Sequence, residues 1–164
     1  MAKKKLVVPK IDRSRIVVKS SPIHGKGVFV VKPIKKGDAI IEYKGERISW
    51  KLAEKRHPHD PKDPNHTFYF SLEDGRCIDA KYGGNAARWI NHSCKPSCET
   101  REDIFSGEPR VFIYAKRDLK LGEELFYDYS LDIGSRVTKR LKKDYECRCG
   151  AKKCRGTMLS LDTK

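Results

Sequence analysis

Three of the chain's six cysteines lie close together near the C-terminus, in the run CRCGAKKC at 147–154. The two-residue spacing of Cys147 and Cys149 disfavours a disulfide between them but allows both thiolates to bind one ion. Gly150 permits a turn after them, and the basic residues nearby favour thiolates over thiols. The spacing C-x-C-x4-C therefore predicts that Cys147, Cys149 and Cys154 bind a structural zinc ion, and such an ion would determine how the C-terminal segment folds.

A tetrahedral zinc ion needs a fourth ligand from elsewhere in the chain. Cys94 and Cys98, in RWINHSCKPSC at 88–98, are both available, and their spacing alone does not choose between them. Joining Cys94 to Cys147 would close a loop of 52 intervening residues, but the entropic cost of a loop grows slowly with its length. Structural zinc binding contributes about 10–16 kcal/mol, which offsets that cost. Free or oxidised thiols are the alternative, and Cys77 is expected in a buried strand.

Positive charge gathers at the two ends of the chain. The formal net charge is +14; residues 1–19 contain seven Lys or Arg and one acid, and residues 136–155 contain nine Lys or Arg and two acids. The remainder is close to neutral. Two basic ends on a nearly neutral body indicate contact with a polyanion, for which nucleic acid is the first candidate. The alternative is a solvated charge run that serves only solubility.

A length of 164 residues indicates one domain, and the pattern along it is mainly β. Short β-rich runs alternate with turn residues, and helical patterning is confined to 49–56, 85–90 and 137–143. The segment 57–65 contains three prolines and is expected to be an exposed loop. We expect several small sheets joined by loops, with strands at 15–18, 28–31, 39–43, 67–72, 76–78 and 110–115.

No stretch of the sequence is long and apolar enough to span a membrane. The start, MAKKKLVVPK, lacks the apolar core of a signal peptide. We therefore expect no membrane contact and no secretion by a classical signal peptide. The cysteines are expected in a reducing compartment, and the alternative is export by a route that the sequence does not reveal.

Four blocks of the sequence occur in the order found in one protein family: HGKGVF at 24–29, RWINHSCKPSC at 88–98, GEELFYDY at 122–129 and CRCGAKKCRG at 147–156. The chain resembles a SET-domain protein-lysine methyltransferase with a post-SET zinc knuckle, most like the trithorax or mixed-lineage-leukaemia type. The resemblance implies a mainly β fold (β-clip, or SET, fold) of several small curved sheets around a knot-like core, with short helices and a C-terminal zinc knuckle. It also implies a basic N-terminal tail at 1–12, a SET domain at 13–134, and a basic linker with the post-SET zinc-binding segment at 135–164.

The resemblance also implies roles for individual residues. Cys94 would be the fourth zinc ligand. Tyr129 would be the catalytic tyrosine, and Tyr127 occupies the position that sets how many methyl groups are added, where a hydroxyl predicts mainly monomethylation. The implied methyl donor is S-adenosyl-L-methionine, and the residues implied to contact it are His24, Gly25, Lys26, Gly27, Phe68, Asn91, His92 and Arg148.

Two of these assignments have a simpler reading from the residues alone. Asn91 and His92 would suit a capped turn with a buried histidine if the other three blocks were absent.

Phe68 stands where many family members have a channel tyrosine, with Tyr69 one residue later. Glycines at 25 and 27 are expected to let the backbone approach the ligand closely. Arg88 is expected to be structural.

The implied activity is S-adenosylmethionine-dependent N-methylation of lysine in a basic protein, a histone or a histone-like DNA-associated protein. One alternative is methylation of a ribosomal or other non-histone protein, and another is a catalytically silent SET-like module that binds nucleic acid. The basic termini suggest contact with DNA or the nucleosome. The implied location is the nucleus and chromatin, or the bacterial cytoplasm with delivery to a host nucleus as a variant.

Overall fold

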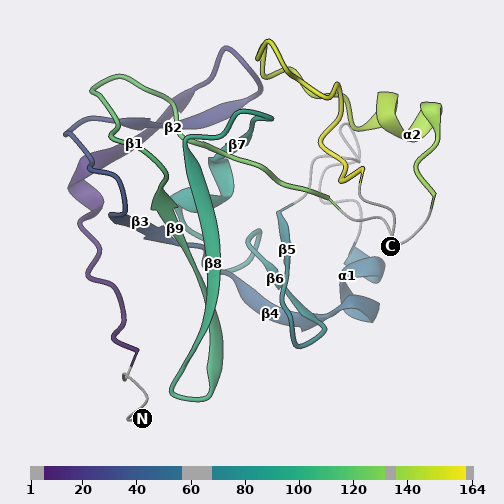
Figure 1. Ribbon diagram of the computed structural model, residues 1–164. Coiled ribbons are helices and arrows are strands. Elements are labelled where there is room, and N and C mark those ends of the chain that lie inside the picture. The colour runs from purple at the N-terminus through teal and green to yellow at the C-terminus, as the bar shows by residue number, and fades with distance from the viewer. Residues whose placement is uncertain (1–5, 57–67, 132–135, 162–164) are drawn as a thin grey trace, which may run out of the picture.

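The computed structural model describes residues 6–56, 68–131 and 136–161, and its architecture is mainly β (Figure 1). Within these residues ten short strands form four small sheets, accompanied by two short α-helices and two 3-10 turns. The predicted fold of small sheets and short helices is confirmed. The elements in chain order are η1 (Arg13–Arg15), β1 (Ile16–Ser20), β2 (Lys26–Val30), β3 (Ala39–Glu42), β4 (Glu46–Ser49), α1 (Trp50–Arg56), β5 (Tyr69–Ser71), β6 (Arg76–Asp79), η2 (Ala86–Trp89), β7 (Asn91–His92), β8 (Cys98–Phe105), β9 (Glu108–Ala115), β10 (Phe126–Tyr127) and α2 (Lys139–Asp144).

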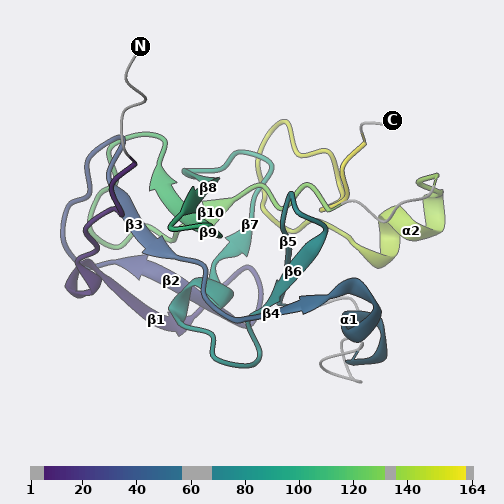
Figure 2. The ribbon, with the colours of Figure 1, turned by 90° about the horizontal axis from the view of Figure 1, so that it is seen from below.

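Three of the four sheets are antiparallel. Strands β1 and β2 form a two-stranded sheet, and the two three-stranded sheets have the orders β3-β9-β8 and β4-β6-β5. The fourth is a parallel pair in which Phe126 and Tyr127 of β10 lie beside Asn91 and His92 of β7. The paired residues are 35 positions apart in the chain and belong to two of the four sequence blocks. In both views β1 and β2 lie on one side of the molecule and α2 on the other (Figures 1 and 2).

One main hydrophobic cluster contains side chains from all four sheets, and a smaller cluster lies between β4, α1 and β6. Val28 and Val30 of β2, Ile40 of β3, and Val111 and Ile113 of β9 are at most 1% exposed. Strand β9 is the middle strand of its sheet and is buried on both faces, which explains its nearly continuous apolar sequence. Ile90, Leu125 and Tyr127, in or next to the β7–β10 pair, belong to the same cluster, so the core holds this pair in place.

The helical predictions at 49–56, 85–90 and 137–143 agree with the structure to within a few residues, and a side chain caps the start of each element. The Ser49 hydroxyl accepts a hydrogen bond from the Leu52 N–H at the start of α1. The Asn85 side chain caps η2, and the Thr138 side chain caps α2. The proline-rich segment predicted to be a loop lies outside the described residues.

Strand β8 was not predicted from the sequence. Its run CETREDIF is mostly charged, and Glu99 and Arg101 form an exposed ion pair at 2.5 Å along the strand. Eight consecutive register pairs with β9, from Cys98 with Ala115 to Phe105 with Glu108, hold it in place. Tertiary pairing, and not the strand's own propensity, determines this element.

Candidate functional site

Four cysteine sulfurs meet where the C-terminal segment contacts the turn after β7. The Sγ atoms of Cys94, Cys147, Cys149 and Cys154 all lie within 4.8 Å of one another. Cys94 Sγ is 3.7 Å from Cys147 Sγ and 3.8 Å from Cys154 Sγ. Zinc–sulfur bonds of about 2.3 Å in a tetrahedron give sulfur–sulfur edges of about 3.8 Å, whereas a disulfide is about 2.05 Å long. The spacing therefore fits a four-thiolate zinc site and excludes disulfides within the cluster.

The other two cysteines lie away from this cluster. Cys98 is 1% exposed in β8, and its Sγ is 3.7 Å from the hydroxyl of Ser97. Cys77 is fully buried in β6, as expected for a strand residue. The geometry thus places Cys94, and not Cys98, beside the three C-terminal cysteines. Burial raises the pKa of both Cys77 and Cys98 to about 11, so both are neutral thiols near pH 7.

His92 connects the cysteine cluster with Tyr129. Its Nδ1 accepts a hydrogen bond from the backbone N–H of Tyr129 at 3.0 Å, and its Nε2 lies 3.5 Å from Cys94 Sγ. Because Nδ1 accepts, the neutral ring carries its proton on Nε2, which donates to the sulfur. Burial lowers the pKa of His92 to about 4, so the ring is neutral at pH 7 and its 3.6 Å contact with Asp128 is not an ion pair.

A second connection runs from the residue after Cys154 to the residue between the two tyrosines. The guanidinium of Arg155 donates two hydrogen bonds of 2.8 Å to the carboxylate of Asp128. Burial raises the pKa of Asp128, but the Arg155 guanidinium outweighs it and lowers that pKa to about 2. Arg155 also donates to the backbone carbonyl of Leu159 at 3.0 Å. The ion pair thus joins the C-terminal segment to the residues directly after β10, between Tyr127 and Tyr129.

The two tyrosines assigned by the resemblance lie side by side in an aromatic group. The ring centroids of Tyr127 and Tyr129 are 4.9 Å apart, and Phe70 and Tyr43 extend the group at 6.4 Å and 5.1 Å. The Tyr129 hydroxyl donates to the backbone carbonyl of Ile90. Burial raises the pKa of Tyr43, Tyr127 and Tyr129 above its ordinary value, so all three phenols are neutral near pH 7.

Asn91 anchors the glycine-containing loop. Its side-chain nitrogen lies 3.2 Å from the His24 carbonyl, 3.0 Å from the Lys26 carbonyl and 2.8 Å from Glu124 Oε1. Among the described residues, no hydrogen bond reaches the Asn91 side-chain oxygen, which leaves it available to a ligand.

The two glycines of this loop are required for different reasons. Gly25 has φ +48°, and a Cβ there would meet open space. A Cβ on Gly27 would fall 2.1 Å from Glu124 Oε1. At position 27 the backbone therefore makes room for a carboxylate of the same chain, whereas the sequence suggested close approach to a bound ligand at both glycines.

The remaining predicted residues differ in how they join the site. The Phe68 ring packs edge-on against Trp89 at 5.3 Å, and the Lys26 ammonium lies 4.9 Å from the centroid of Trp89. Arg148 is exposed, and no hydrogen bond or ion pair joins its side chain to any other residue that the structure describes. Arg88 donates to the Ala80 carbonyl at 3.3 Å, a structural contact.

Asp128 and Glu124 were not predicted as site residues, and Arg155 was expected only to favour thiolates, not to pair with Asp128. Each belongs to one of the four blocks, but an ion pair between residues 27 apart leaves no local pattern. The signal for Asp128 was its place between two tyrosines, and the signal for Arg155 was its place directly after the last cysteine. The Glu124 carboxylate also accepts from the Ser21 hydroxyl at 3.0 Å, which closes the loop that contains Gly27.

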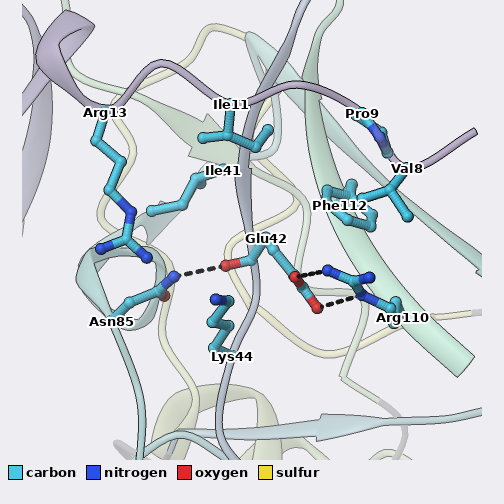
Figure 3. Close-up of a pocket in the computed structure, with 10 residues that line it drawn as sticks. All are labelled: Val8, Pro9, Ile11, Arg13, Ile41, Glu42, Lys44, Asn85, Arg110 and Phe112. Atoms are coloured by element: carbon cyan, nitrogen blue, oxygen red, sulfur yellow. Dashed lines mark hydrogen bonds and ion pairs between the residues drawn. The ribbon is translucent and has the colours of Figure 1, made fainter. Parts of the chain in front are cut away.

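A separate pocket of about 230 Å³ lies beneath the N-terminal segment (Figure 3). Its back carries the paired side chains of Glu42 and Arg110, joined at 2.6 Å and 3.0 Å. The pocket shares no residue with the predicted site. The lining residues are Val8, Pro9, Ile11, Arg13, Ile41, Glu42, Lys44, Asn85, Arg110 and Phe112.

The SET domain family matches residues 25–130, more than half of the chain. The chain is 37% identical over 150 residues to "Histone-lysine N-methyltransferase set1" of Dictyostelium discoideum, an alignment that covers 91% of this chain and 10% of that protein. It is 38% identical over 146 residues to "Histone-lysine N-methyltransferase 2B" of Homo sapiens, covering 89% of this chain and 5% of that protein. It is 37% identical over 161 residues to "Histone H3-lysine(4) N-trimethyltransferase ATX1" of Arabidopsis thaliana, covering 96% and 14%.

The chain therefore belongs to the SET domain family, and its relatives include histone-lysine methyltransferases of the trithorax type. It spans between 4% and 14% of the length of these relatives. Neither α-helix in the described part of the chain is long and apolar enough to cross a lipid bilayer.

Proposed function

We propose that the protein is an S-adenosylmethionine-dependent protein-lysine N-methyltransferase that acts on a histone or histone-like DNA-associated protein. The observation that carries this proposal is the joining of the Tyr127–Tyr129 pair to the four-cysteine cluster by two separate contacts, through His92 and through Arg155. The relatives named as histone-lysine methyltransferases supply the reaction and the class of substrate.

The loop at 24–27 and the β7 turn would hold the cofactor. Asn91 offers a side-chain oxygen that is free to accept a hydrogen bond, and a Cβ at Gly25, in the loop that Asn91 anchors, would meet open space. His24, Lys26, Gly27 and His92 lie on the same two segments, with Phe68 and the exposed Arg148 as further candidates. When bound, S-adenosylmethionine supplies a methyl group on a positively charged sulfur, which an amine can displace.

The substrate lysine must lose its proton before it can accept a methyl group. A lysine with the ordinary pKa of about 10.4 costs about 4 kcal/mol to neutralise at pH 7.4. The aromatic group of Tyr43, Phe70, Tyr127 and Tyr129 provides apolar surface that lowers this cost, since burial disfavours the ammonium. Holding the amine in line with the reacting carbon contributes several kcal/mol more.

Tyr129 is the proposed catalytic residue. Its phenol is neutral and its hydrogen points to the Ile90 carbonyl, so its oxygen lone pairs face away from that bond. These lone pairs can orient the target amine and stabilise positive charge as it develops there. The Tyr129 backbone is itself fixed by the hydrogen bond to His92.

Tyr127 is proposed to limit the product mainly to monomethyl-lysine. It is 7% exposed and adjoins Tyr129, so its hydroxyl can hold a water in the space that a further methyl group would need. The Arabidopsis relative is named a trimethyltransferase, so membership of the family does not determine the product. Mass spectrometry of products from the wild type and Tyr127→Phe tests this: abundant trimethylation by the wild type contradicts it, and a shift to higher methylation in the variant supports it.

The zinc ion proposed at Cys94, Cys147, Cys149 and Cys154 is structural because four protein ligands leave no open position.

We propose domain limits of 1–12 for the basic tail, 13–134 for the SET domain and 135–164 for the basic linker and zinc-binding segment. We also propose that the basic termini contact DNA. The proposed location is either the nucleus, at chromatin, or a bacterial cytoplasm. Deleting residues 1–10 tests the N-terminal contact, and unchanged DNA affinity removes that segment from it.

A methyl-transfer assay with radiolabelled S-adenosylmethionine and a panel of histones tests the proposed activity. We expect signal on at least one histone. The rate of methyl transfer should fall by about 100-fold or more in Tyr129→Phe, a loss typical of removing a positioned catalytic hydroxyl. Tyr82→Phe, an exposed tyrosine outside the site, is the matched control and should retain full activity. Signal that survives Tyr129→Phe, or no signal on any protein, favours the catalytically silent nucleic-acid-binding module. Signal only on non-histone proteins of a lysate favours methylation of a ribosomal or other non-histone protein.

A further inference from the structure

Two loops at the edge of the molecule away from α2 lie side by side. They are residues 31–38, between β2 and β3, and residues 116–123, between β9 and β10; we call them the paired loops (Figures 1 and 2). Ile34 and Leu119 exchange backbone hydrogen bonds of 2.8 Å and 3.3 Å. The Lys36 backbone N–H donates to Asp118 Oδ1 at 2.8 Å. These bonds fix the two loops as one surface.

The paired loops are rich in exposed cations. The six cationic side chains are Lys32, Lys35, Lys36, Lys116, Arg117 and Lys120, and all are exposed. The two Ile34–Leu119 hydrogen bonds hold the two lysine-containing loops side by side.

The acids of the same loops are occupied by the backbone. The Asp38 carboxylate accepts from the Lys35 N–H at 3.1 Å and pairs with Arg15. The Glu123 carboxylate accepts from the Lys120 N–H at 2.9 Å and pairs with Arg117. With Asp118 these are the three acids of the paired loops, against six cations, so the two loops together carry a formal net charge of +3.

The lysine ammonium groups are consequently left without carboxylate partners. Lys32 Nζ donates to the Ser14 hydroxyl at 3.0 Å. Within the described residues, no ion pair reaches the ammonium groups of Lys35, Lys36, Lys116 or Lys120. The surface therefore presents several uncompensated positive charges on a fixed backbone.

We propose that the paired loops bind the phosphate backbone of double-stranded DNA. Single strands are bound through aromatic side chains that stack on bases, and neither 31–38 nor 116–123 contains an aromatic residue. Protein interfaces are depleted in lysine, whereas lysine serves as a point charge for phosphate. Duplex phosphates, contacted without sequence specificity, are the polyanion that this surface fits.

This surface is distinct from the basic termini proposed above. It belongs to the body of the domain, whose overall charge is close to neutral, so the chain's composition gave no sign of it. The inference concerns binding alone and does not depend on methyl transfer.

The test uses the full chain and a fluorescent 30-base-pair duplex of arbitrary sequence, titrated over a series of salt concentrations. In the loop variant, Lys35, Lys36, Lys116 and Lys120 are each changed to Gln. In the control variant, the exposed Lys44, Lys51, Lys55 and Lys81 are changed to Gln, so both variants lose the same charge. Thermal unfolding of both variants establishes that each is folded.

We expect the loop variant to bind at least about tenfold more weakly than the wild type at low salt, with a salt slope reduced by roughly 0.9 for each phosphate that the protein no longer neutralises. The control variant should stay within about twofold of the wild type, since it neutralises as many phosphates as the wild type does. Equal weakening in both variants, or none in the loop variant, overturns the proposal. So does equal or tighter binding of the wild type to a 30-nucleotide single strand or to polyglutamate.

Discussion

The body of the domain and its C-terminal segment, residues 136–161, are each stabilised by a different kind of interaction. The body contains nearly all the buried apolar side chains, including Val28, Ile40 and Ile113, each fully buried. In the C-terminal segment only Thr157 and Leu159 are buried among the described residues. A segment with so little apolar burial cannot offset its loss of chain entropy by the hydrophobic effect. Its structure depends on the proposed ion at the four cysteines and on a few polar contacts.

The proposed active site lies between these two regions. Tyr127 and Tyr129 belong to the body through β10 and its parallel pair with β7. The C-terminal segment reaches them through the Arg155–Asp128 pair and through Cys94 and His92. The body should therefore fold without an ion, whereas the proposed methyl transfer should require one.

Removal of the metal should have the largest effect. Dialysis against a zinc chelator should lower methyl transfer by about 100-fold or more, because structural zinc contributes about 10–16 kcal/mol to the fold of such segments. Far-ultraviolet circular dichroism should keep most of its β signal, and added zinc should restore activity. A metal-free protein that keeps more than half of its activity, or that loses the fold of the body, contradicts the separation of the two regions.

Ile113→Ala should show the converse behaviour. Truncating this buried β9 side chain should destabilise the body by about 2–5 kcal/mol in urea unfolding, as for other large-to-small core changes. The content of one zinc per chain should be unchanged in the folded protein. Destabilisation below about 1 kcal/mol would show that the cluster around β9 is not the main source of the body's stability.

High pH should weaken the body through its buried phenols. Tyr43, Tyr127 and Tyr129 have raised pKa values in the folded state, so their contribution is complete below pH 10 and is lost as the pH rises further. With an unfolded pKa of about 10, linkage gives about 0.8 kcal/mol of lost stability per tyrosine at pH 10.5. Urea unfolding at pH 8 and pH 10.5 measures it. Absorbance at high pH that shows all seven tyrosines ionising together in the folded protein would contradict it.

Changing the Arg155–Asp128 pair should have the smallest effect and should act on activity alone. Arg155→Lys removes the two-point hydrogen bonding, and we expect kcat to fall about tenfold with little change in KM, unfolding free energy or zinc content. Asp128→Asn should act similarly, and the double variant should be no worse than either single one. Additive losses would show that the two side chains act independently, in disagreement with their 2.8 Å hydrogen bonds.

The parts that the sequence predicted are those with a local pattern. Helical patterning at 49–56 and 137–143 indicated the two helices, and the spacing of Cys147, Cys149 and Cys154 indicated three ligands of one ion. The fourth thiol could not be chosen from spacing, because Cys94 and Cys98 belong to the same turn-rich run and only the tertiary fold separates them. The same limit applies to the charged strand β8, which forms because β9 pairs with it along its whole length.

X-ray absorption spectroscopy at the zinc edge measures the number of sulfur ligands of the ion that is proposed to join the body to the C-terminal segment. We expect four sulfurs at about 2.3 Å in the wild type, four in Cys98→Ser and three in Cys94→Ser. Fewer than four sulfurs in the wild type, or the loss of one in Cys98→Ser with none lost in Cys94→Ser, would contradict a metal centre that joins the C-terminal segment to the β7 turn.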